Sequence, residues 1–165
     1  MSRLPLLLAL PAAACDVGGT PELADDFEDT LTTEGGCADL YVFAVDDADE
    51  VLLEIRFDGV IDEATYGQIF EQDYTLPDPT IEAAVEVGEK VSDAACDDVI
   101  ENGGPQIDET WNAVSGTVHL VVEIGEHTTL SDVTLEDVVF ESEDGEQVTV
   151  ETFDWVDIGV GWFPG

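Results

Sequence analysis

Apolar and acidic residues alternate along much of this chain, a pattern that is typical of β-strands with one buried face. Residues 80–87 are the clearest case. The apolar residues of this stretch fall on one face of an extended chain and the glutamates on the other: Ile81, Ala83, Val85 and Val87 against Glu82 and Glu86. Because successive side chains of a strand point to opposite faces, the spacing predicts a half-buried strand of an antiparallel sheet.

Turn signals separate further segments of the same kind. Residues 39–45 and 51–57 are rich in apolar residues and flank the acidic run 46–50, which predicts a hairpin with an acidic loop. Asp144-Gly145 predicts a second hairpin turn. Gly116 interrupts the long β-rich stretch 110–124, where it predicts a bulge or a bend.

Two of the later strands have a predicted core face. After Gly116 this face is formed by Val118, Leu120, Val122 and Ile124. In the last strand it is formed by Val156, Ile158, Val160 and Trp162. Together the segments predict an all-β fold, an antiparallel β-sandwich or small barrel of about eight or nine strands. We also expect the aromatic side chains of the C-terminal half to fill the core rather than form a ligand patch: Trp111, Phe153, Trp155, Trp162 and Phe163.

The N-terminus has a different character. Arg3 precedes an apolar run over residues 4–14, which ends in three alanines before Cys15. A positive start, a short apolar run and small residues predict a secretory signal peptide. The run is too short to cross a bilayer, which takes about 20 residues.

With a cysteine directly after the small residues, this segment resembles the signal peptide of bacterial lipoproteins. The resemblance implies cleavage before Cys15, attachment of acyl chains such as palmitate to Cys15, and a domain on the extracytoplasmic side of the cell envelope. The alternative is an ordinary cleaved signal, with Cys15 as a free or paired thiol.

The number of cysteines agrees with lipidation. The chain has three, Cys15, Cys37 and Cys96, so one is left over if the others pair in an oxidising compartment. We therefore expect a Cys37–Cys96 disulfide, which would close a loop of about 60 residues. The alternative, two reduced buried thiols, is disfavoured by export.

These features divide the chain into three parts. Residues 1–14 are the predicted signal peptide. Residues 15–36 contain Cys15 and a stretch of Gly, Thr, Pro and acids with little periodicity, which predicts a flexible acidic tether. Residues 37–165 are the predicted single all-β domain.

The charge limits the partners. The chain has 40 Asp and Glu but only 3 Lys and Arg, a formal net charge of −37. Such a surface repels nucleic-acid phosphates and anionic lipid headgroups, so we expect no nucleic acid, and contact with the membrane through the lipid anchor only. Three explanations of the acidity stay open: tolerance of high salt, binding of calcium or another hard cation, and recognition of a cationic partner such as an envelope protein.

Candidate catalytic residues are few. His119 and His127 are eight residues apart, which is not a metal-finger spacing, and both are expected on the surface. No Gly-x-Ser-x-Gly motif is present, so a small extracytoplasmic hydrolase is the least favoured function and no catalytic residue is predicted. The acidic loop could hold a weakly bound calcium ion, the only cofactor considered, on Asp46, Asp47, Asp49 and Glu50.

The sequence favours a lipoprotein of the envelope with a non-enzymatic structural or interaction role. A cation-binding module is the alternative from a different class.

Overall fold

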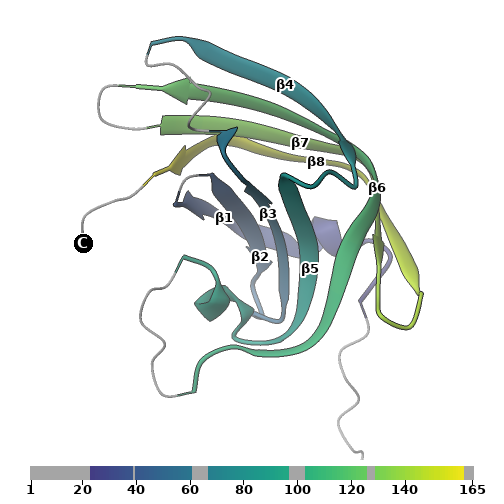
Figure 1. The fold of residues 1–165 in the computed structure, drawn as a ribbon. Coiled ribbons are helices and arrows are strands. Elements are labelled where there is room, and N and C mark those ends of the chain that lie inside the picture. The colour runs from purple at the N-terminus through teal and green to yellow at the C-terminus, as the bar shows by residue number, and fades with distance from the viewer. Residues whose placement is uncertain (1–22, 39, 61–66, 97–102, 126–128, 162–165) are drawn as a thin grey trace, which may run out of the picture.

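The structure is a computed structural model and describes residues 23–38, 40–60, 67–96, 103–125 and 129–161. This part of the chain forms eight strands and two short 3-10 helices (Figure 1). The strands are β1 (Leu31–Cys37), β2 (Tyr41–Asp46), β3 (Val51–Phe57), β4 (Ile69–Leu76), β5 (Ile81–Glu89), β6 (Gln106–Ile124), β7 (Thr129–Glu141) and β8 (Gln147–Val160). The 3-10 helices are η1 (Phe27–Thr30) and η2 (Val91–Ala94). None of the helices in these ranges is long and apolar enough to cross a membrane.

All neighbouring strands are antiparallel and belong to one sheet, in the order β1-β2-β3-β5-β6-β7-β8. The sheet curls so that β1 lies against β8, and a bridge between Ala38 and Gly161 joins its two ends. β4 is off this path and pairs with the second half of β6. The all-β prediction is therefore confirmed, as a sheet nearly closed into a barrel.

The hydrophobic core fills the inside of this barrel. The apolar residues of the alternating segments point into it, as predicted, except at one position of β8. The apolar positions of residues 80–87 are all buried, from 7% exposed at Ile81 to 0% at Val85 and Val87. In β6, Val118, Leu120 and Val122 are wholly buried. Trp111 and Trp155 also lie in the core, and neither indole N–H has a hydrogen-bond partner among the described residues. Trp162 and Phe163 lie outside the described residues.

β6 and β7 bend together at the predicted position, Gly116. The register of the two strands shifts between Ala113 and Thr117. Gly116 has a φ of +125°, and a Cβ added there would lie 2.6 Å from the Cα of Val138. Only glycine fits this close approach in this conformation. On β7 the bulge residue is Asp137, with a φ of 50°. The bulge shifts the alternation by one residue, so that Val138 rather than Asp137 points into the core.

The prediction for β8 is wrong at one position. Val156 was expected on the core face, but its side chain is 60% exposed, whereas Trp155 is fully buried. A bulge at Asp157, with a φ of 57°, reverses the alternation before Ile158. The Asp132 carboxylate on β7 accepts the Asp157 N–H at 2.7 Å and so satisfies the backbone group that the bulge frees.

The predicted tether is wrong over its second half. Leu23 and Phe27 are buried in the main core, and β1 pairs with β2 along its whole length. The sequence of β1 is LTTEGGC. Its two glycines interrupt any alternation of apolar and polar residues, so the sequence does not predict a strand here. They also let the strand pack closely: a Cβ at Gly36 would lie 2.7 Å from Ile158 on β8. Cys15 and the predicted signal peptide lie outside the described residues.

Candidate functional site

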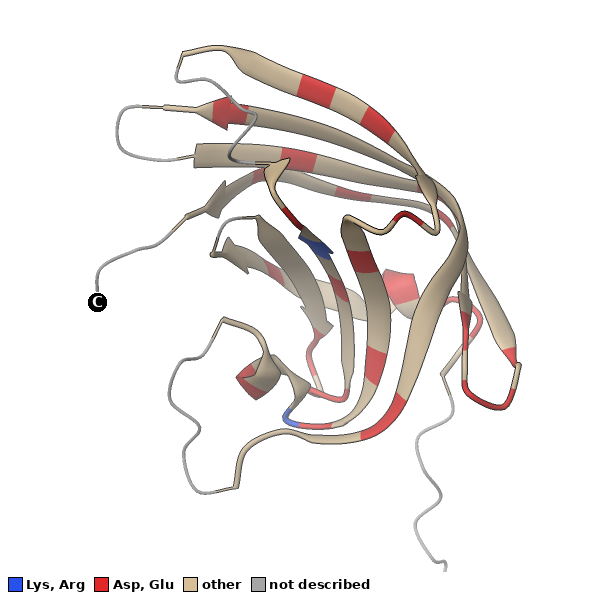
Figure 2. Cartoon of the chain, viewed as in Figure 1, with Lys and Arg blue, Asp and Glu red and all other residues tan. Residues whose placement is uncertain are grey.

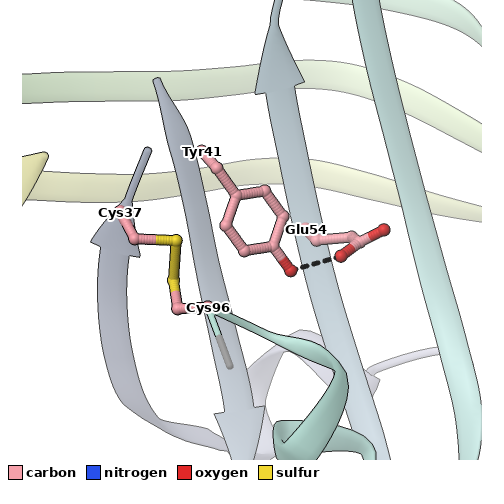
Figure 3. The surroundings of a disulfide bond; sticks show 4 residues. All are labelled: Cys37, Tyr41, Glu54 and Cys96. Carbon is pink, nitrogen blue, oxygen red and sulfur yellow. Dashed lines mark hydrogen bonds between the residues drawn. A yellow bond between two sulfur atoms is a disulfide. The ribbon is translucent and has the colours of Figure 1, made fainter. Parts of the chain in front are cut away.

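Cys37 and Cys96 form a disulfide, as predicted, with Cα atoms 5.8 Å apart (Figure 3). Cys37 ends β1, and Cys96 follows η2. The bond holds residues 90–96 against the outer face of β2 and β3. There a second, smaller apolar cluster forms outside the barrel, from Tyr41, Val45, Leu52, Val91 and Ala95.

The acidic loop between β2 and β3 uses its carboxylates to hold the local backbone. Asp46 Oδ1 accepts the N–H groups of Glu50 and Val51 at 2.8 and 2.9 Å. Asp49 Oδ1 accepts the N–H of Ser92 at 2.8 Å, which ties the loop to η2. These bonds are those of a turn and a cap.

Asp47 Oδ1 accepts the Thr32 hydroxyl at 2.6 Å. Of the four candidate calcium ligands, Asp46, Asp47 and Asp49 thus each accept a hydrogen bond from the protein. Within the described ranges no three His, Cys, Asp or Glu side chains are grouped as a metal site would need.

A polar network lies beside the disulfide, on the outer face of β2, β3 and β5 (Figure 3). The Tyr41 hydroxyl donates to the Glu54 carboxylate, and the Arg56 guanidinium lies 5.2 Å from the centre of the Tyr41 ring. Arg56 also reaches Glu82 at 3.7 Å, but both side chains are more than half exposed, so this ion pair is weak. Burial, and after it the Glu54 charge, raises the pKa of the Tyr41 phenol well above its ordinary value.

Glu86 lies on the same outer face, opposite Leu52 of β3 and Thr110 of β6. One of its carboxylate oxygens is buried and has no hydrogen-bond partner among the described residues. Burial first, and repulsion from Glu54 second, raise the pKa of the Glu86 carboxyl. A carboxyl in this position is therefore protonated more readily than a glutamate in water.

Two surface hollows of about 440 Å³ each lie on this side of the barrel and share Thr110 and Asn112. The other residues that line the first hollow are Ile107, Asp108, Glu109, Glu143 and Asp144. The other residues that line the second hollow are Glu54, Ile81, Glu82, Ala83, Ala84, Glu86 and Ala113. The polar lining of both, among the described residues, consists of carboxylates, one hydroxyl and one amide, without histidine, cysteine or lysine. Such a lining suits a cation better than it suits nucleophilic catalysis.

His119 lies on the outer face of β6 and is partly exposed, as predicted. Its Nδ1 is 2.6 Å from Asp73 Oδ1, and its Nε2 is 3.8 Å from Glu71 Oε1, both on β4. The hydrogen bond to Asp73 is the main cause of the raised pKa of His119, and the charge of Glu71 adds to it. Both ring nitrogens thus face carboxylates. His127 lies outside the described residues.

The Tyr41–Glu54–Arg56 network was not predicted from the sequence. Residues 39–45 are rich in apolar residues on both faces, but Tyr41 and Phe43 point out of the barrel and Val42 and Ala44 point in. The signal that could have found it is the hairpin itself, since the short acidic loop fixes the register that places Tyr41 opposite Arg56.

The acidic surface surrounds all these features. Figure 2 shows Asp and Glu on the strands and turns of both halves of the barrel. Arg56 and Lys90 are the only Lys or Arg residues within the described ranges. Family models, curated proteins and solved structures were all compared with this chain, and none of them matches it.

Proposed function

We propose that the protein is a lipid-anchored module of the bacterial cell envelope, which works by binding a partner rather than by catalysis. The observation that carries the proposal is the Cys37–Cys96 disulfide. Structural disulfides persist in oxidising, extracytoplasmic compartments, so the bond supports export. It also leaves Cys15 as the unpaired cysteine, directly after the signal-like segment.

The surface chemistry supports binding. The most prominent polar features outside the barrel are carboxylates, and the histidine that the structure describes is held between two of them. A surface of this kind attracts cationic groups over a distance set by the salt concentration. We therefore expect a positively charged partner at the envelope.

Intact-mass measurement of protein extracted from membranes tests the anchor. We expect a chain that begins at Cys15 and carries the added mass of acyl chains. The variant Cys15→Ser should leave the membrane fraction while its remaining two cysteines stay unreactive to thiol reagents. An unmodified Cys15 in the membrane-extracted chain, or a Cys15→Ser variant that remains membrane-bound, would refute the proposal.

A further inference from the structure

Among the described strands, none pairs with one of the two edges of β4. Through its other edge it pairs with residues 116–123 of β6, from Ile69 opposite Glu123 to Leu76 opposite Gly116. No other strand in the described part of the chain pairs with it. Figure 1 shows β4 at the margin of the curled sheet. An unpaired edge presents a row of backbone N–H and C=O groups that can accept an additional strand.

The core is incompletely covered along the same edge. Gln72 of β4 shares the core-facing row with Phe70, because its partner on β6 is the wholly buried Leu120. Even so, Gln72 is exposed and Phe70 is only half-buried. The neighbouring β6 positions in this row, Val118 and Val122, are 0% exposed. A further strand beside β4 would cover the part of the row that β6 does not.

The outer face of β4 is acidic and exposed. Glu71 and Asp73 stand two residues apart on this face, with side chains 67% and 75% exposed. His119 touches both but lies behind them on β6, on the side away from the free edge. Ile69, on the same face, is 66% exposed.

The negative charge of Glu71 and Asp73 disfavours a second copy of β4 at this edge and favours a basic strand. A second copy of β4 in antiparallel pairing would bring Glu71 and Asp73 close to the same two carboxylates, and each copy carries a formal net charge of −37. Like charges on facing strands are destabilising, whereas opposite charges are stabilising. The edge therefore favours a strand with Lys or Arg at alternate positions.

We propose that the free edge of β4 is a docking site for an extended basic segment of a partner protein, which joins the sheet as an added strand. Alternate Lys or Arg side chains of the segment face Glu71 and Asp73. The residues between them are apolar and lie beside Phe70 and Gln72. Backbone hydrogen bonds supply the affinity, and this alternation supplies the specificity. The inference names the partner for the interaction role proposed above and rests on it.

The probe is a synthetic peptide of alternating lysine and valine, about eight residues long to match β4. It is titrated into the full protein, purified from membranes in a non-ionic detergent, and binding is followed by fluorescence anisotropy. Hydrogen exchange of β4 amides is measured with and without peptide. We expect saturable binding and slower exchange in β4.

Charge reversal tests the site. The variant Glu71→Lys/Asp73→Lys should bind the peptide at least about tenfold more weakly and should instead bind a peptide of alternating glutamate and valine. The matched control is Asp25→Lys/Asp26→Lys, which makes the same change of charge at two exposed residues just before η1. It should bind the basic peptide within about twofold of the wild type. Equal weakening in both variants would mean diffuse attraction and would overturn the proposal.

Backbone pairing has its own test. Two versions of the basic peptide are N-methylated on alternate residues, one set in each. An added strand pairs through one edge only, so one version should lose binding and the other should retain it. Equal binding of both versions overturns the proposal, as does self-association of the protein through β4 at high salt. Lipidation of Cys15 is measured by mass, so a failure of the anchor is separate from a failure of the docking site.

Discussion

Removing the disulfide with Cys37→Ala/Cys96→Ala is expected to lower the free energy of unfolding by about 4 kcal/mol. The bond joins residues 59 apart in sequence. In the chain-entropy model, closing a loop of that length lowers the entropy of the unfolded chain by about 14 cal/mol/K, which is about 4 kcal/mol near room temperature. The folded barrel should persist, because β1 still pairs with β2 and lies against β8.

The assay is urea unfolding followed by the fluorescence of the buried Trp111 and Trp155. The midpoint should fall while the cooperative transition remains. Asp49→Ala is the control, since it removes the hydrogen bond that the Ser92 N–H donates to the Asp49 carboxylate but keeps the disulfide. It should cost only about 1 kcal/mol. A loss below about 1 kcal/mol in the cysteine variant would refute the loop-entropy argument.

Three further outcomes are expected. Asp132→Ala should cost about 1–2 kcal/mol in urea unfolding, because the N–H of the Asp157 bulge loses its acceptor. A cost equal to that of Glu151→Ala, an exposed acid on β8, would contradict this. The wild type should be more stable than His119→Gln below pH 6.5, and this advantage should be lost as the pH rises through the raised folded-state pKa of His119. Unfolding of both proteins at a series of pH values measures it, and a difference that does not change with pH would contradict it. Sodium chloride should raise the melting temperature by screening the net charge of −37, and calcium chloride at matched ionic strength should raise it no further. An additional rise with calcium would contradict screening as the whole cause.

The sequence was sufficient for features that depend on alternation and on turn residues. The buried and exposed faces of β5 were predicted correctly from residues 80–87, because alternate residues of a regular strand point to opposite faces. The Asp144-Gly145 turn was predicted because it needs a residue with positive φ, and Gly145 has a φ of 83°. The disulfide followed from the count of cysteines.

Other features depend on contacts between distant segments. Asp137 and Asp157 adopt positive φ where β7 and β8 bulge, and aspartate does so too rarely for a pattern to reveal it. The face of Val156 was predicted wrongly for this reason. The pairing of β4 with β6 rather than with β5, its neighbour in sequence, is likewise a property of the whole sheet.

The division of β6 between two partners has a consequence for the order of folding. β5, β6, β7 and β8 are consecutive and can pair as successive hairpins, whereas β4 must pass β5 to reach the same edge of β6, beyond Gly116. Contacts across longer loops form more slowly. Until β4 arrives, half of that edge is bare, which makes such a species prone to aggregate. A strongly acidic chain keeps its copies apart during this interval, so the charge protects the nascent barrel as well as the finished one.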